Sequence, residues 1–254
     1  MTEGAGGPHD GAMANRILEK ITAKDHRLSS YRYFELLVHV YVVVLLISNL
    51  VGQKTSAFGP FRVSGAQLLF PITYIFSDIF TEVYGYGASR RAIWIAFMAS
   101  ILMAAMGMFM VWIPPAEGFR NQAAFEAVFG AVPRMVAASL LAFWAGEFTN
   151  SYVLARMKVW TGGRWLWTRT IGSTVAGQLI DSIIVTFGFF YGRESVPHIL
   201  QIIASGYIIK VAYEAAATPV TYWIVNALKK SEGVDVYDVG TDFNPFGHEQ
   251  HQEG

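Results

Sequence analysis

The sequence predicts an all-α integral membrane protein with six transmembrane helices. Of its 254 residues, 53% are hydrophobic and only 15% are charged, whereas soluble domains carry about 25% charged residues. The charges are gathered between apolar runs of about 20 residues, the length that crosses about 30 Å of hydrocarbon as a helix. A backbone in lipid must satisfy its own hydrogen bonds, so we expect these runs to be helical.

The chain divides into a polar N-terminal segment (1–30), a transmembrane domain (31–230) and a C-terminal tail (231–254). The N-terminal segment lacks the apolar core of a signal peptide; we expect a disordered start and then an amphipathic piece at 16–27. The tail is polar, and we expect it to be loose. The predicted transmembrane spans are 34–51, 66–84, 92–113, 135–154, 171–191 and 199–228.

Prolines and turn signals set the boundaries between these spans. Pro114-Pro115 should end the third span, and Pro133 suits the first turn of the fourth. Pro219 should bend the sixth span or divide it in two. Between the first two spans, the alternating segment 54–65 with its Gly-Pro turn predicts a small hairpin, and 121–129 predicts a short surface helix.

The basic residues predict how the chain lies in the membrane. With the N-terminus in the cytoplasm, thirteen Lys and Arg residues fall in inside segments and five in outside segments. Cytoplasmic segments carry the excess of positive charge in multi-pass proteins. We therefore expect both termini in the cytoplasm, which agrees with an even number of spans.

The composition also argues against several function classes. The net charge is zero, so nothing indicates nucleic-acid binding, and the chain has no cysteine for disulfide or thiolate chemistry. The six histidines have no metal-ligand spacing. No cofactor or metal site is predicted.

Several ionisable or amide side chains lie inside the predicted spans. A charge at the centre of a bilayer costs about 2.5–3.5 kcal/mol on insertion scales, so such residues normally face protein or water. Here they recur at i,i+3 or i,i+4 spacing and share one face of each helix. We expect these faces to line one cavity and form a substrate-binding site. The candidates are Asn49, Asp78, Glu82, Glu147, Asn150, Gln178, Asp181, Lys210 and Glu214.

Some candidates also have purely structural interpretations. Glu82 is predicted near a helix end, where Arg90 and Arg91 would make it an interfacial carboxylate instead of a ligand. Lys210 and Glu214 would also serve as a buried pair that only holds the sixth span. Asn49 would simply link helices by a hydrogen bond.

The residue types favour a neutral or cationic heteroaromatic ligand. A carboxylate can accept two adjacent N–H donors, such as those of a guanine-like edge. Carboxamides can bind the remaining carbonyl and ring nitrogen, and aromatic faces can sandwich the ring.

Two motifs resemble those of the queuosine precursor transporter family, also called the vitamin uptake transporter family. They are Asp-x-x-Thr-Glu-Val-Tyr-Gly at 78–85 and Gly-Gln-x-x-Asp-Ser at 177–182. The resemblance covers about residues 31–230. Further matching segments are Ser48-Asn-Leu, Phe70-Pro-Ile-Thr, Arg91-Ala-Ile-Trp94, Asn150-Ser, Arg169-Thr-Ile-Gly-Ser-Thr174 and Thr218-Pro219.

The resemblance implies uptake of a 7-deazaguanine such as preQ0 or preQ1 across the inner membrane. It also implies a six-helix arrangement like that of the substrate-binding subunits of energy-coupling-factor transporters. Glu147 stands where the resemblance predicts glutamine in many members, so substrate preference or proton coupling here would differ. The residues carried over by motif are Asn49, Asp78, Thr81, Glu82, Asn150, Gln178 and Asp181.

A secondary transporter is therefore the leading hypothesis, with a homodimer as a further expectation. The alternative is a substrate-binding subunit that needs a separate ATP-driven module, because the chain has no phosphate-binding loop of its own. An intramembrane enzyme is disfavoured, since no nucleophile or metal motif supports it. A structural scaffold is disfavoured because its buried acids would be costly without use.

Overall fold

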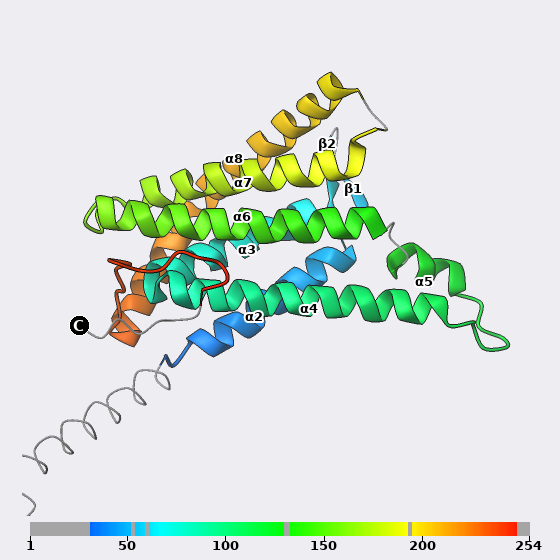
Figure 1. Ribbon diagram of the computed structural model, residues 1–254, viewed down its shortest axis with the longest axis horizontal. Coiled ribbons are helices and arrows are strands. Elements are labelled where there is room, and N and C mark those ends of the chain that lie inside the picture. The colour runs from blue at the N-terminus through cyan, green and yellow to red at the C-terminus, as the bar shows by residue number, and fades with distance from the viewer. Residues whose placement is uncertain (1–30, 52–53, 59–60, 130–132, 193–194, 248–254) are drawn as a thin grey trace, which may run out of the picture.

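The computed structural model describes residues 31–51, 54–58, 61–129, 133–192 and 195–247 as a helical bundle with one small hairpin (Figure 1). The segments expected within 1–30 lie outside the described residues. The elements are α2 (Phe34–Val51), β1 (Thr55–Phe58), β2 (Phe61–Ser64), α3 (Gly65–Ile79), the π-helical turn η1 (Phe80–Tyr84), α4 (Tyr86–Trp112), α5 (Gln122–Phe129), α6 (Pro133–Trp160), α7 (Leu166–Phe190) and α8 (Val196–Glu232).

Most of the predicted boundaries are confirmed. The hairpin forms, with Thr55 opposite Ser64, the short surface helix is α5, and α6 begins at Pro133. Helix α4 ends at Trp112, just before the two prolines. Of the two outcomes expected at Pro219, division is wrong, because α8 runs unbroken for 37 residues through this proline; a bend there stays a prediction. A proline removes one backbone hydrogen bond but need not end a long helix whose neighbours hold it.

Four helices of the described chain are long and apolar enough to cross a membrane: α2, α4, α7 over Leu166–Gly188, and α8. Helix α3 has only 15 residues before η1, and α6 carries Glu147, Arg156 and Lys158. The count of six spans stays a prediction. Large apolar side chains are exposed on the outer faces, as a lipid environment requires; Leu102 is 63% exposed and Ile208 is 65% exposed.

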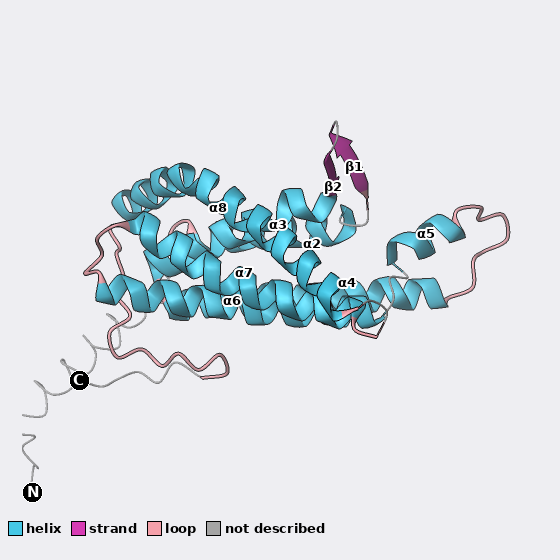
Figure 2. Ribbon diagram, turned by 90° about the horizontal axis from the view of Figure 1, so that it is seen from above, coloured by secondary structure: helices cyan, strands magenta, loops and turns pink. Residues whose placement is uncertain are grey.

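Helices α6 and α7 form the central pair of the bundle and lie side by side along their length (Figures 1 and 2). A Cβ on Gly177 would lie 2.8 Å from the carbonyl oxygen of Gly146 and 2.9 Å from Cβ of Asn150. Small residues permit such close helix approach. The two glycines therefore bring the polar face of α6 directly against that of α7.

The described N-terminal residues and the C-terminal segment lie at the same end of the bundle, which we call the tail end (Figure 1). Aromatic rings pack edge to face there, with Phe34 5.1 Å from Tyr84 and 5.5 Å from Phe80 between ring centroids. Edge-to-face contacts of this kind add to the stability that burial provides. They fix the start of α2 against η1.

The expectation of a loose tail is wrong for residues 234–247, and residues 248–254 lie outside the described residues. Residues 234–247, here called the C-terminal strap, are packed against the tail end. The backbone N–H of Val236 donates to the carbonyl of Val83 at 3.3 Å. The Asp238 carboxylate accepts the N–H of Tyr86 at 3.0 Å and so caps the first turn of α4. The first backbone N–H groups of a helix have no acceptor within the helix, and the strap supplies one at the start of α4.

Candidate functional site

A buried pair of polar side chains joins α3 to α6. Asn150 Nδ2 donates to Asp78 Oδ1 at 2.7 Å, and Ser173 of α7 donates more weakly at 3.5 Å. Both Asp78 and Asn150 are fully buried. The second carboxylate oxygen of Asp78 has no hydrogen-bond partner in the described part of the chain.

Other buried polar atoms around this pair are also without partners among the described residues. Both oxygens of Glu147 and both of Glu214 are unpartnered, although the two side chains are completely buried. We call the Asp78–Asn150 pair, these two acids and three further buried residues the inner polar cluster. Its members are Tyr74, Asp78, Glu147, Asn150, Thr174, Gln178 and Glu214.

The members converge from four helices. Tyr74 of α3 lies within electrostatic range of Glu147 on α6, Asp181 on α7 and Glu214 on α8. A Cβ on Gly146 would come within 2.5 Å of the Tyr74 hydroxyl and 2.9 Å of Cβ of Asp181. Glycine at position 146 therefore makes room for the tyrosine hydroxyl beside Glu147.

Unpartnered buried carboxylates are costly, because each oxygen loses its water without gaining a hydrogen bond. Few buried polar atoms in native proteins lack a hydrogen-bond partner, and each one that does needs a physical explanation. The unpartnered oxygens of three acids and two carboxamides offer acceptors for several N–H donors of a ligand; the residues are Asp78, Glu147, Glu214, Asn150 and Gln178. No group of three potential metal ligands is found in the described ranges.

Asp181 and Lys210 form an ion pair at the edge of this cluster. Lys210 donates to the Asp181 carboxylate and, at 3.4 Å, to the hydroxyl of Ser182. The predicted pairing of Lys210 with Glu214 is therefore wrong. The two residues share a face of α8, but the lysine reaches across to α7, which leaves Glu214 without a partner.

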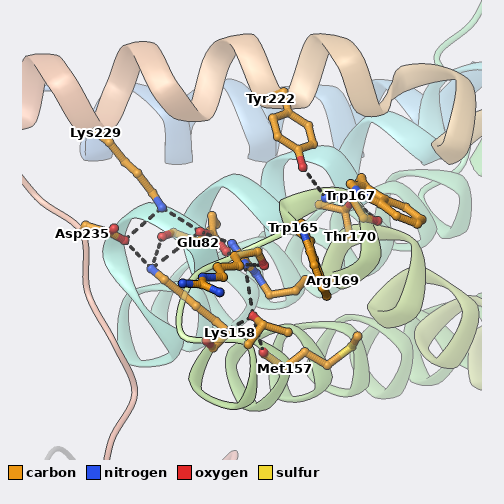
Figure 3. A network of polar contacts seen from close by, with 12 residues as sticks. Glu82, Met157, Lys158, Trp165, Trp167, Arg169, Thr170, Tyr222, Lys229 and Asp235 are labelled. Atoms are coloured by element: carbon orange, nitrogen blue, oxygen red, sulfur yellow. Dashed lines mark hydrogen bonds and ion pairs between the residues drawn. The ribbon is translucent and has the colours of Figure 1, made fainter.

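Glu82 lies in a second group of charges at the tail end, the ion cluster (Figure 3). Its carboxylate accepts from Arg169 of α7 at 2.7 Å and from Lys229 of α8 at 2.6 Å. Lys158 of α6 lies 3.8 Å from the same oxygen. The Lys158 ammonium also donates to the carboxylate of Asp235 in the strap at 2.6 Å.

The arrangement assigns Glu82 partners that differ from those expected. Arg90 instead donates to the strap carbonyl of Asn244 at 2.9 Å, and Arg91 pairs with Glu35 on the exposed surface at 2.8 Å. Glu82 is 0% exposed. It holds three cations from three helices together, so its surroundings indicate a structural role.

The surroundings of Asp235, the strap residue in the ion cluster, favour its ionised form. Burial raises the pKa of Asp235, but hydrogen bonds from Lys158 and Lys229 lower it by more, and the net pKa lies below its ordinary value of 3.8. An acid that is stabilised as its anion keeps its ion pairs throughout the physiological range.

The remaining candidate, Asn49, lies half-buried near the end of α2. No hydrogen bond within the described ranges joins it to the inner polar cluster. The structure brings together Asp78, Asn150, Glu147 and Glu214, with the Asp181–Lys210 pair and the buried Gln178 on α7.

Sequence reasoning missed the roles of Lys158, Lys229 and Asp235. The excess of basic residues on one side predicts only the orientation of the chain, and the aspartate lies in a tail expected to be loose. The signal available was the position of both lysines one turn or less from a helix end, where basic side chains also meet buried acids.

Comparisons with known proteins identify the family. Residues 64–224 match the family described as "Putative vitamin uptake transporter". The chain belongs to this transporter family. It is also 29% identical, over 176 residues, to the "Probable queuosine precursor transporter" of Bacillus subtilis (strain 168), covering 69% of this chain and 77% of the relative. No solved structure matches.

Membership fixes the broad function. The protein is a multi-pass membrane transporter for a small-molecule substrate, not an enzyme. The matched region contains every member of the inner polar cluster and both glycines of the α6–α7 contact.

Proposed function

We propose that this transporter imports a 7-deazaguanine precursor of queuosine, such as preQ0 or preQ1, across the inner membrane. The observation that carries the proposal is the set of unpartnered carboxylate oxygens on Glu147 and Glu214 beside Asp78 and Gln178. The relative from Bacillus subtilis is named for the same class of substrate.

Glu147 is the residue we assign to the N–H edge of the base. Asp181 is already bound to Lys210 and Asp78 to Asn150. Neither Glu147 oxygen has a hydrogen bond from a described residue; the nearby hydroxyls of Thr73 and Ser77 are bonded to Phe70 and Ser151 instead. A carboxylate with two open oxygens accepts two parallel N–H bonds, which gives geometric specificity as well as energy. Gln178 would bind the carbonyl edge.

The test is uptake of labelled preQ0 and preQ1 by cells that neither make nor import either base. The intact chain should restore uptake. Glu147→Gln keeps the size of the side chain but replaces one acceptor by a donor, and should reduce uptake at least about a hundredfold, since a buried donor facing a donor is left unpaired. Glu35→Gln, on the exposed surface, is the matched control. Uptake unchanged by Glu147→Gln would refute the assignment.

We further propose that the protein works as a secondary transporter with both termini in the cytoplasm. The inner polar cluster holds more acids than cations, so one or more acids can carry a proton with the substrate. Purified protein in liposomes should accumulate preQ0 when a pH gradient is imposed and should need no ATP. Accumulation that requires an added ATP-driven partner would refute this coupling.

A further inference from the structure

The second half of the strap lies along the seam between α4 and α6 (Figure 1, red). The ring of Phe243 packs edge to face on Tyr86 of α4 and on Tyr152 of α6, with 5.0 Å between centroids in both cases. The Tyr86 hydroxyl also donates to the carbonyl of Phe243 at 2.9 Å. One strap residue therefore bridges both helices.

The end of the strap repeats this bridge about two helical turns further along the seam. Phe246 packs 5.5 Å from Trp94 of α4 and 5.6 Å from Trp144 of α6. The indole N–H of Trp94 donates to the carbonyl of Pro245 at 2.8 Å. These aromatic contacts and hydrogen bonds therefore hold the second half of the strap against α4 and α6.

Beneath the strap, the seam is lined by small polar side chains. Ser89 of α4 bonds Ser151 of α6 at 2.8 Å, and Ser151 bonds Ser77 of α3 at 3.0 Å. All three serines are fully buried. Ser77 also lies close to Glu147 of the inner polar cluster, so the hydroxyl chain leads from the seam to that cluster.

The strap has the features of a segment that can detach without unfolding the bundle. Phe246 stays 67% exposed even when docked, residues 234–247 form no helix or strand, and Asp238 is the one strap residue that is buried. Segments with few buried apolar contacts open at lower free energy than the core. Asp235 tethers the strap to the ion cluster, so its second half can move while its start stays anchored.

We propose that the C-terminal strap is a gate: its release from the α4–α6 seam opens the serine-lined route between the inner polar cluster and the tail end, and its docking closes that route. The proposal rests on the proposed function in taking the inner polar cluster as the transport site. The strap lies at the end that we assign to the cytoplasm, so it controls the exit of an imported substrate.

The first test measures opening without any substrate. The chain has no cysteine, so Ser151→Cys places a single thiol of nearly the same size beneath the strap. In purified protein in lipid nanodiscs, a charged maleimide should label it slowly. Adding Phe243→Ala should raise the labelling rate about tenfold or more, because opening no longer breaks the ring contacts. Phe243→Leu should raise it less.

Thr170→Cys is the matched control, since Thr170 is also fully buried at the tail end but lies on α7, away from the seam. Its labelling rate should not change with Phe243→Ala. Two results would overturn the gate: no acceleration at Ser151→Cys, or an equal acceleration at both positions, which would make the strap a general brace of the bundle.

The second test asks whether the strap must move during transport. In the variant with Tyr152→Cys and Phe243→Cys, a short bis-methanethiosulfonate linker should tie the strap to α6. Uptake of preQ0 should fall to the background of empty cells and return after reduction. Full uptake by the cross-linked protein would overturn the gate. No uptake before cross-linking would instead refute the substrate assignment, which the labelling test does not use.

Discussion

Replacing the acid at the centre of the ion cluster provides a direct test of its structural role. In Glu82→Gln, the guanidinium of Arg169 and the ammonium of Lys158 keep their charges at 1% and 0% exposure but lose their shared carboxylate. Removing one partner of a buried ion pair costs about 3–5 kcal/mol. Because Asp235 still neutralises Lys158, we expect about 3 kcal/mol, the lower end.

The change can be measured as the midpoint of thermal unfolding in detergent, followed by tryptophan fluorescence. A loss of about 3 kcal/mol lowers the midpoint by about 6–12 °C for a chain of this size. Glu35→Gln is the matched control, because Glu35 meets Arg91 at 2.8 Å while both side chains are more than half exposed. An exposed pair contributes about 1 kcal/mol or less.

The reasoning is refuted if the two variants unfold at the same temperature. It is also refuted if Glu82→Gln unfolds like the parent protein but no longer binds preQ0, because Glu82 would then be a ligand and not a structural acid. Binding below the unfolding midpoint should instead persist in Glu82→Gln.

Three further predictions concern packing, pairing and pH. Gly146→Ala should cost about 1–3 kcal/mol of stability through overpacking, whereas Gly206→Ala, with nothing within 4 Å of its new Cβ, should cost nothing measurable; equal midpoints would contradict the close α6–α7 contact. Lys210→Met should destabilise the protein more than Lys210→Met combined with Asp181→Asn, because the single change leaves a buried acid unpaired; a more stable single variant would contradict the pair. The folded pKa of Asp235 lies below 3.8, so its contribution to stability is present above pH 3.8 and is lost as the pH falls through the folded pKa. The difference in unfolding midpoint between parent and Asp235→Asn should therefore stay constant from about pH 5 to 8 and shrink below pH 3.8; a difference that shrinks near neutral pH would contradict the assignment.

Much of the candidate site could be predicted from local spacing. Asp78 and Glu82 were placed on one helix face, as were Glu147 with Asn150 and Gln178 with Asp181, because side chains three or four residues apart share a face of a helix. The faces do meet for Asp78, Glu147, Asn150 and Gln178. Asp78 and Glu82, however, serve two separate clusters. Glu82 lies within the π-helical turn at 80–84, which changes the direction of its side chains relative to the α-helix before it.

By itself, the sequence determined where the helices begin and end and which polar side chains each helix turns inward. Those features are local: proline removes a backbone donor, and apolar runs and i,i+4 spacing act within one helix. Only the tertiary structure decided which charges meet. Lys210 binds Asp181 and not its neighbour Glu214, Glu82 binds Arg169, and the tail docks on α4. Such pairings depend on how closely and at what rotation the helices pack, as the approach of Gly146 to Gly177 illustrates for α6 and α7. No pattern within a single helix specifies this packing.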